Sequence, residues 1–386
     1  MNNTRLLFIV NVDWFFISHR LPIALEAIRQ GYEVHIATTI TDKTDFLLNK
    51  GLIVHPINLH RSKSGIISII SEFVEIFSLV RQVSPDILHL VTIKPVLLGG
   101  LVARLQGAPS VVSAISGLGF VFVGSDFVSL LRRKLISMIY YLSLGHFNQR
   151  IIFQNIDDKN YLSKLTRLPL DNSTIIQGSG VDLSAYKELP IPHGTPIVLL
   201  AARLLIDKGV REFVHAAELV NKNKVNARFV LAGEIDKYNP ASIREQELEE
   251  WVKSGVVEFF GCRNDMESVL SRATIVVLPS YREGFPKVLV EAASCGRAVI
   301  TTDVPGCRDA IEKYVTGLLV PVRNVEALSK AISELLSNPS RCREMGISGR
   351  KRAERLFDIK KIVMENINIY KQILGDIKST TMHNDN

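Results

Sequence analysis

Short apolar runs alternate with longer amphipathic segments along most of the chain. Runs of four or five apolar residues between polar or glycine-containing turns are typical of buried parallel strands, and the segments between them have the length of helices. In the first half, the predicted strands are Leu6–Val10, Glu33–Thr38, Ile53–Ile57, Ile87–Leu90, Ser110–Ser113, Ile151–Gln154 and Thr174–Ile176, and the predicted helices are Pro22–Gln30, Ile66–Val83 and Leu97–Leu105. A strand, a helix and a strand within about thirty residues predict a Rossmann-like opening.

The same alternation begins again after a stretch with the composition of a linker, Gly178–Asp182 followed by Pro190–Pro196. Beyond it, the predicted strands are Ile197–Ala201, Ala227–Ala232, Val256–Phe260, Thr274–Leu278, Ala298–Thr301 and Gly317–Val320, and the predicted helices are Gly209–Asn221, Glu245–Ser254, Asp265–Ser271, Val325–Leu336 and Ile359–Leu374. Two doubly wound α/β domains are therefore expected, at residues 1–180 and 181–358. A cleft is expected between them, since such sheets bind ligands at the carboxyl ends of their strands. Residues 376–386 are expected to form a polar, flexible tail.

One strand–turn–helix unit of the second half carries two carboxylates. Its helix is opened by Pro286 and stopped by Gly296. Glu283 lies in the turn, and Glu291 lies about one and a half turns into the helix. Acids can bind hydroxyls while the backbone N–H groups at the helix start bind an anion, a combination that suits a sugar nucleotide. The alternative is an ordinary unit with two solvated acids. The N–H groups are those of Gly284, Phe285 and Lys287.

The segment from Glu283 to Glu291, within E-G-F-P-K-V-L-V-E-A, resembles the signature of the retaining glycosyltransferases called group 1 or family 4. The resemblance implies that Glu283 contacts the donor sugar and that Glu291 holds the ribose hydroxyls. It also implies the GT-B architecture, in which a final helix at 359–375 crosses back to the first domain. The first domain then binds the acceptor, and the second binds the nucleotide sugar, with uridine as the expected base. The residues between the acids that are expected to contact the donor are Gly284, Phe285, Pro286 and Lys287.

Two cations follow the first strand of the second domain. Arg203 and Lys208 lie in Ala201–Gly209, and their spacing resembles the R-x4-K-G phosphate motif of the same family. Fixed cations there would stabilise the charge that develops on a diphosphate leaving group, with Arg203 gripping two oxygens and Lys208 acting as a point charge. A solvated basic loop is the alternative.

The transfer is predicted to need no metal and no cofactor. No Asp-x-Asp motif stands where a metal-bridging pair is expected, since Asp157 and Asp158 are adjacent and belong to a helix that opens at Asn155. The protein's own cations would take the place of the metal, in agreement with the GT-B resemblance.

Two more loops of the second domain are expected to line the cleft, one at Gly233 and one after Gly261. The resemblance puts the second loop beside the nucleotide base, which makes Arg263 and Asn264 candidates for base contacts. A helix cap at Asn264 or Asp265 explains these residues equally well.

The segment after the first strand departs from the family pattern. Many relatives carry a glycine-rich loop there, whereas Asp13–Pro22 contains bulky aromatic residues. His19 and Arg20 resemble the His/Arg segment of members that extend polyprenyl-diphosphate-linked sugars. His19 is expected to bind hydroxyls or to assist proton transfer, and Arg20 to bind the acceptor. A structural histidine in a helix-entry loop is the alternative.

Two later loops of the first domain add acceptor candidates. Either His89 or Lys94 is expected at the cleft, and Lys94 is the better candidate for an acceptor phosphate. Gly117 and Gly119 resemble the G-L-G loop of the same polyprenyl-dependent members and permit close approach of the acceptor.

The formal net charge of +7 favours anionic partners. Nucleic acid is not expected, since no zinc-ligand spacing, aromatic RNA-binding motif or Lys/Arg run supports it. Four scattered cysteines argue against a disulfide framework.

Membrane contact without a transmembrane helix is expected, because no apolar span reaches about twenty residues. Residues 66–79 and 127–147 are strongly apolar, and Arg132–Lys134 concentrate charge in one turn of the second segment. We predict two interfacial helices on an anionic membrane, with core helices as the alternative. The expected location is cytoplasmic, peripheral on the inner face of the plasma membrane.

Taken together, the sequence predicts a retaining glycosyltransferase that moves a hexose or N-acetylhexosamine from a UDP-sugar to a polyprenyl-diphosphate-linked sugar in bacterial surface glycan assembly. A UDP-sugar epimerase of the same fold and a non-catalytic, membrane-docked nucleotide-sugar-binding protein are the alternatives. A dehydrogenase is disfavoured, because no G-x-G-x-x-G follows the first strand of either domain.

Overall fold

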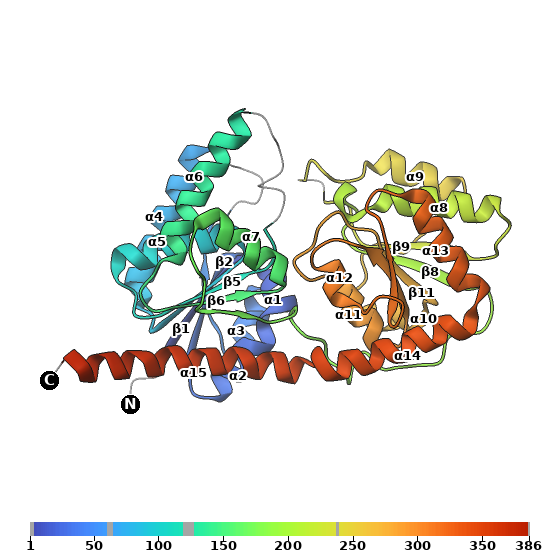
Figure 1. Cartoon of the computed structure of the whole chain (residues 1–386). Helices are drawn as coiled ribbons and strands as arrows, with labels where there is room; N and C mark the ends of the chain where they lie inside the picture. The colour runs from blue at the N-terminus through green and yellow to red at the C-terminus, as the bar shows by residue number, and fades with distance from the viewer. Residues whose placement is uncertain (1–3, 60–64, 119–126, 237–238, 385–386) are drawn as a thin grey trace. The chain divides into compact units, whose positions relative to one another are not determined.

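The computed structural model describes residues 4–59, 65–118, 127–236 and 239–384, with the backbone alone at 127–133 and 376–384. The chain divides into two compact units (Figure 1). One consists of Met1–Ser179 together with Lys360–Asn386, and the other of Gly180–Ile359. Each unit has its own parallel sheet and its own apolar core.

The first unit is built on a parallel sheet with the strand order β3-β2-β1-β4-β5-β6-β7. The chain starts in the middle, winds to one edge and returns past β1 to the other edge, which is the doubly wound order with its switch point between β1 and β4. Leu7 of β1 pairs with His35 of β2 and with Leu88 of β4. The strands are β1 (Arg5–Val12), β2 (Glu33–Thr39), β3 (Ile53–Pro56), β4 (Ile87–Val91), β5 (Val111–Ile115), β6 (Gln149–Phe153) and β7 (Ser173–Ile175).

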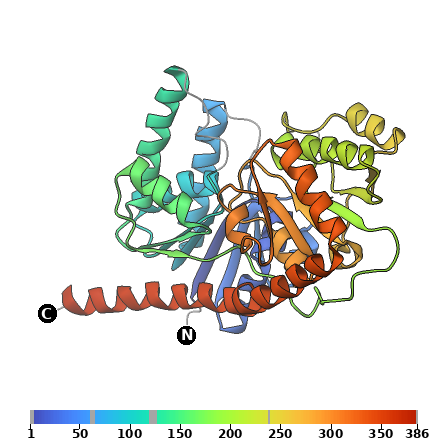
Figure 2. The ribbon, with the colours of Figure 1, turned by 45° about the vertical axis from the view of Figure 1, so that its right-hand side comes forward.

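Helices cover both faces of this sheet (Figures 1 and 2), which is why β4 and β5 are mostly apolar and are buried at every position. The final helix belongs to this unit although it follows the second in sequence: the hydroxyl of Tyr370 lies 2.6 Å from His89 Nδ1, and Asn148 Nδ2 donates to the carbonyl of Ile373 at 3.2 Å. The helices are α1 (Asp13–His19), α2 (Leu21–Arg29), α3 (Thr44–Asn49), α4 (Ile66–Val83), α5 (Ile93–Gln106), α6 (Phe127–Leu144), α7 (Ile156–Thr166) and α15 (Ile359–Asn384).

The second unit repeats the plan with the strand order β10-β9-β8-β11-β12-β13, again all parallel, with the switch point between β8 and β11. Its strands are β8 (Ile197–Ala201), β9 (Arg228–Ala232), β10 (Glu258–Phe259), β11 (Ile275–Leu278), β12 (Ala298–Thr302) and β13 (Gly317–Val320). Its helices are the short 3-10 helix η1 (Ile206–Lys208), α8 (Val210–Lys222), α9 (Glu245–Lys253), α10 (Met266–Arg272), α11 (Lys287–Ser294), α12 (Cys307–Ala310), α13 (Val325–Ser337) and α14 (Pro339–Leu356).

Besides the short helices α3, η1 and α12, the helices α1 and α14 were not predicted from the sequence. α1 occupies the segment in which a helix-entry loop was expected, so His19 ends a helix and does not precede one. α14 is strongly polar, and its buried stripe consists of small or flexible residues that apolar patterning does not count. That stripe is Cys342, Met345, Gly346, Gly349 and Ala353.

The structure continues α15 to Asn384, into the stretch 376–386 for which a flexible tail was predicted. No proline interrupts this stretch, and an established helix adds residues at little cost.

Three of the four cysteines, Cys295, Cys307 and Cys342, are buried free thiols, and Cys262 is exposed. Within the described residues, no helix combines the length and the apolar character needed to cross a membrane.

Candidate functional site

The loop after β8 and the turn after β11 meet at the carboxyl edge of the second sheet. Lys208 Nζ lies 2.5 Å from Glu283 Oε1, and the hydroxyl of Ser280 donates to the same oxygen at 2.7 Å. The backbone N–H of Tyr281 donates to the carbonyl of Asp207 at 2.9 Å, which ties the loop to the turn. The structure therefore brings one predicted cation and one predicted acid into contact at the switch point of the sheet, where doubly wound folds bind ligands.

Two glycines allow this close packing. A Cβ added to Gly209 would lie 2.2 Å from the carbonyl oxygen of Pro279, and one added to Gly306 would lie 2.6 Å from that of Glu283. Both glycines have positive φ, +72° and +79°, which side chains rarely adopt. The position of the Glu283 turn thus depends on two backbones that approach it without side chains.

Arg203 makes a different contact from the one expected. Its Nη1 lies 3.1 Å from Asp236 Oδ2, and a third of its side chain is exposed. Asp207, next to Lys208 in the same loop, is half-buried. Desolvation raises the pKa of its carboxyl, and the nearby Lys208 acts in the opposite direction. The two predicted cations and Glu283 thus all act electrostatically on one half-buried acid.

Glu291 lies on α11 with 9% of its side chain exposed, and Lys287 Nζ approaches its carboxylate at 3.4 Å from one turn earlier. Pro286 is the N-cap of α11, one position before the first helical position at which it was predicted. The side chain of Phe285 is buried edge-to-face against Phe357, with ring centroids 5.5 Å apart, so its backbone is the part available to a ligand.

Among the remaining residues that were predicted to bind the sugar-nucleotide donor, Gly233 has a tightly constrained backbone. Its φ is +144°, its N–H donates to the carbonyl of Gly261 at 2.8 Å, and a Cβ there would lie 1.8 Å from a backbone oxygen. Arg263 is bound by the carboxylate of Asp265 through two hydrogen bonds of 2.8 and 2.7 Å. Asp265 is the N-cap of α10, one of the two positions predicted, although its side chain makes no cap hydrogen bond; Asn264 is exposed.

In the first unit, His19 is held by its own helix. Its ring stacks on Phe15 with centroids 4.1 Å apart, and its Nδ1 lies 3.2 Å from the Phe15 carbonyl oxygen. Arg20 is 96% buried; its guanidinium donates to the His19 carbonyl at 3.1 Å and to the Ser116 hydroxyl at 3.4 Å. Burial lowers the pKa of Arg20 to about 10. No carboxylate among the described residues forms an ion pair with this guanidinium.

Lys94 Nζ lies 2.8 Å from Oε1 of Glu72, which is almost fully buried on α4. His89 does not end its strand at a cleft, as was expected, but is fully buried in the middle of β4, where it stacks on Phe8. Burial holds the pKa of His89 well below its usual value. Gly117 has a φ of +105°, as a close-approach loop needs, whereas Gly119 lies outside the described residues.

Sequence reasoning missed the partners of the predicted residues. Ser280 stands three positions before Glu283, and this spacing is a usable signal within a turn. Asp236 and Glu72 come from other loops and helices, so no local pattern could have paired them with Arg203 and Lys94.

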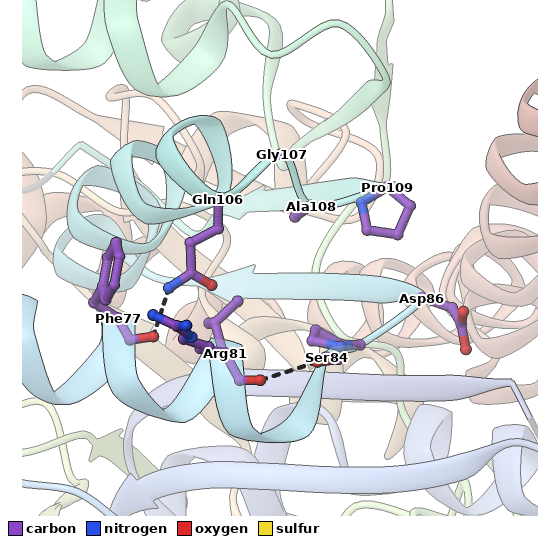
Figure 3. A pocket seen from close by; sticks show the side chains of 10 residues that line it. Phe77, Arg81, Ser84, Asp86, Gln106, Gly107, Ala108 and Pro109 are labelled. Carbon is purple, nitrogen blue, oxygen red and sulfur yellow. Dashed lines mark hydrogen bonds between the residues drawn. The ribbon is translucent and has the colours of Figure 1, made fainter.

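A cavity of about 430 Å³ lies where α4 and α5 end, at the amino edge of the first sheet (Figure 3). Phe77, Arg81 and Gln106 line it, and Gln106 Nε2 donates to the Phe77 carbonyl at 2.6 Å. None of the predicted site residues lines this cavity. In the described part of the chain, no group of three or more His, Cys, Asp or Glu side chains is arranged to hold a metal ion.

Two family models match the chain. The model described as glycosyl transferases group 1 matches residues 184–352, and the model described as glycosyl transferase 4-like matches residues 5–155.

Curated relatives align over most of their length. The chain is 30% identical over 345 residues to the N,N'-diacetylbacillosaminyl-diphospho-undecaprenol alpha-1,3-N-acetylgalactosaminyltransferase of Campylobacter jejuni, covering 84% of this chain and 89% of the relative. It is 24% identical to the capsular polysaccharide biosynthesis glycosyltransferase CapM of Staphylococcus aureus, covering 97% of this chain and 99% of the relative.

Solved structures share the fold. Anabaena Alr3699/HepE in complex with UDP superposes with a TM-score of 0.77 at 15% identity, covering 96% of this chain and 100% of that one. Sucrose-phosphate synthase of Thermosynechococcus elongatus superposes with a TM-score of 0.78 at 20% identity, covering 97% and 100%. These matches confirm the predicted fold class, two Rossmann-like domains of the GT-B type.

Proposed function

The chain belongs to the group 1 glycosyltransferases, and from this premise we propose that it moves a hexose or N-acetylhexosamine from a UDP-sugar to a polyprenyl-diphosphate-linked sugar in bacterial surface glycan assembly. The named activities of the Campylobacter jejuni relative and of an Escherichia coli diphosphoundecaprenol galactosyltransferase, 23% identical over 326 residues, support this acceptor class.

The observation that carries the proposal is the contact between Lys208 and Glu283 at the carboxyl edge of the second sheet. When the glycosidic bond breaks, negative charge develops on the diphosphate, and a fixed ammonium within reach stabilises that charge. Arg203 adds a guanidinium that can exchange Asp236 for a phosphate. In the same site, Glu283 orients the donor sugar and Glu291 binds the ribose hydroxyls.

Transfer proceeds with retention and without a metal in this proposal. The sugar leaves and the acceptor hydroxyl attacks on the same face, and the departing diphosphate accepts the proton of that hydroxyl. Lys208 and Arg203 supply the positive charge that a metal would otherwise bring, so no cofactor is needed. Gly233, Arg263 and Asn264 belong to the loops proposed to border the nucleotide.

The first unit binds the acceptor in this proposal. Arg20 is a buried cation held by a carbonyl and a hydroxyl oxygen, and the diphosphate of a lipid-linked acceptor would give its charge an anionic partner. Lys94 offers a second cation that can exchange Glu72 for an acceptor phosphate. His19, at the end of α1, and Gly117, in the loop after β5, complete this proposed subsite.

The membrane-facing surface is proposed to be the exposed part of α4 and α6. Both helices pack on α5, and in both views they extend beyond the sheet on the same side (Figures 1 and 2). Their exposed apolar side chains include Ile66, Ile67, Ile70, Val74, Leu135 and Met138, with Lys134 exposed beside them. An apolar stripe bordered by a cation fits the headgroup region of an anionic bilayer, which supports a peripheral location on the inner face of the plasma membrane.

The proposal is tested with the purified chain, a panel of radiolabelled UDP-sugars and undecaprenyl-diphosphate-linked sugars extracted from bacterial membranes. Transfer of label from one UDP-sugar into the lipid fraction is expected, with the donor's anomeric configuration retained by NMR and with undiminished rate in EDTA. A change of the sugar in the donor alone, without acceptor, would identify an epimerase. Tight UDP-sugar binding with no transfer would identify a non-catalytic binding protein.

A further inference from the structure

The cavity of about 430 Å³ in the first unit contains none of the residues assigned to the transfer reaction. Gln106, which lines it, ends α5, whereas Lys94 lies near the start of the same helix. At a rise of about 1.5 Å per residue, about 18 Å of helix separates the two residues. The cavity therefore lies at the amino edge of the first sheet, apart from the acceptor residues proposed at its carboxyl edge.

Hydrogen bonds to distant parts of the chain hold two polar side chains that line the cavity. Gln106 Nε2 donates to the Phe77 carbonyl at 2.6 Å, and Asp86 Oδ2 accepts from the backbone N–H of Arg5 at 2.7 Å. In the part of the chain that the structure describes, Gln106 Oε1, Asp86 Oδ1 and the guanidinium of Arg81 have no hydrogen-bond partner. The lining thus offers both acceptors and donors to a ligand.

Rings and small side chains make up the apolar part of the lining, which includes Phe77, Pro85, Ala108 and Pro109. In Figure 3, the rings of Phe77 and Pro109 lie on either side of Gln106. A ligand with apolar C–H faces and a rim of hydroxyl groups matches such a lining, because its faces contact the rings and its rim contacts the polar groups. A pyranose has this structure, and each of its hydroxyls both donates and accepts.

The charges around the cavity favour a neutral ligand. The carboxylate of Asp86 and the C-terminal ends of α4 and α5, where the helix dipoles are negative, disfavour an anion such as a nucleoside diphosphate. The guanidinium of Arg81 disfavours an organic cation. A neutral sugar can pair with the donors and the acceptors without adding a net charge.

We propose that this cavity is a carbohydrate site, separate from the reaction centre, that binds a neutral pyranose unit of a glycan. Arg81, Gln106 and Asp86 bind its hydroxyls, and the rings of Phe77 and Pro109 contact its C–H faces. The inference goes beyond the proposed transfer and does not depend on it, since none of these residues takes part in that reaction.

The test is saturation-transfer NMR on the full chain, in which titration with methyl α-D-glucopyranoside gives a dissociation constant. A glycoside of this size is expected to bind with a constant of about 1 mM. Arg81→Met, at an exposed arginine, should weaken binding about tenfold, and Gln106→Leu about threefold, because each removes hydrogen bonds to hydroxyls. Arg343→Met, at an exposed arginine of the second unit, is the control and keeps the wild-type constant.

The charge argument is tested by competition. Glucose 1-phosphate and D-glucosamine should displace the methyl glycoside only at concentrations about tenfold higher than a second neutral glycoside, methyl α-D-galactopyranoside, requires. Displacement by either charged sugar at the concentration of the neutral one would overturn the proposal.

The site itself is refuted if the wild-type chain binds no glycoside well above the expected dissociation constant. Wild-type constants in both Arg81→Met and Gln106→Leu would place any bound glycoside outside the cavity and would refute it too. Thermal unfolding verifies that both variants are folded. The rate of sugar transfer by Arg81→Met should equal that of the wild type, and a chain that transfers no sugar would contradict the proposed function while leaving the binding result in place.

Discussion

Lys208 is paired with an acid before any substrate is present. Its ammonium and the carboxylate of Glu283 are both mostly buried, and Ser280 donates to the same carboxylate oxygen. Because the pair already holds the Lys208 side chain in one place, little further side-chain entropy would be lost when a phosphate binds. In the proposed function, the pair therefore contributes to catalysis by preorganisation more than to stability.

Replacing Lys208 by Met is expected to lower kcat about 100-fold, because one fixed donor to the developing charge is lost. Steady-state kinetics measure kcat with the UDP-sugar that the labelled panel identifies as the donor. Thermal unfolding verifies that the variant is folded. Lys222→Met, at an exposed lysine near the end of α8, should leave kcat unchanged. Wild-type kcat in the Lys208 variant is the outcome that contradicts the assignment.

The pair of Lys94 and Glu72 is predicted to matter for stability as well. Glu72 is 2% exposed, so Lys94→Met leaves a buried carboxylate without its ammonium and should lower the free energy of unfolding by about 3 kcal/mol. The double variant Glu72→Met with Lys94→Met should recover most of that loss, because no buried charge remains. Urea unfolding measures both. A loss below about 1 kcal/mol in the single variant, as for an exposed pair, would overturn the prediction.

At the scale of elements, an edge strand of the first sheet contributes to a contact between two histidines. β3 lies at the edge of the first sheet, where His55 Nε2 is 2.9 Å from His35 Nδ1, and the other nitrogen of His35 is 2.9 Å from Glu33. The hydrogen bond between the facing nitrogens needs a proton on only one of them. Burial, and then the neighbouring His35, lowers the pKa of His55.

The free energy of unfolding of the first unit is therefore expected to fall at acidic pH because of His55. The unfolded histidine takes up a proton near pH 6.5, whereas folded His55 does so at lower pH, so the unfolded state binds more protons as the pH falls and stability drops below about pH 6.5. His55→Gln should lose less free energy of unfolding between pH 7.5 and 5.5 than the wild-type protein does, as measured by urea titration. His193→Gln, at an exposed histidine, should behave as the wild type. Equal losses in all three proteins would show that the pair does not titrate as described.

At the scale of the whole molecule, the chain passes between its two units twice, after Ser179 and after Ile359. The two passages are tied together, since the N–H of Val181 donates to the Phe357 carbonyl at 2.8 Å and that of Ile359 to the Val181 carbonyl at 3.0 Å. The final helix then packs on the first unit through Tyr370. In the proposed function, the acceptor carries a long lipid tail, so the first unit would work at a bilayer, and the exposed face of α4 would contact that bilayer.

Replacing Ile67 and Ile70 together by Ser is expected to abolish sedimentation with vesicles that contain anionic lipid, because both side chains are mostly exposed apolar groups on one helix. Transfer to a short-chain, water-soluble acceptor should stay at the wild-type rate. Val322→Ser, at an exposed position of the second unit, is the control. Undiminished vesicle binding of the double variant would place the membrane contact elsewhere.

Much of the fold could be predicted because each unit repeats one local pattern. Buried parallel strands such as Ile275–Leu278 are continuous apolar runs. The helix α7 starts at Asn155 as predicted, and Asn155 Oδ1 accepts from the N–H of Asp158 at 2.8 Å. α14 was missed because small residues such as Gly346 form its buried face, and close approach to the backbone of Gly296 makes them necessary.

What the sequence determined by itself is the order of strands and helices, the strand–turn–helix unit with Glu283 and Glu291, and the cations at Arg203 and Lys208, because each depends on neighbours within a few turns of chain. Only the tertiary structure decided which groups meet: Lys208 with Glu283, Arg203 with Asp236, Lys94 with Glu72, and His89 inside the core. The physical reason is that parallel strands distant in sequence end at one edge of a sheet, so the packing of the sheet, and not local spacing, selects the partners.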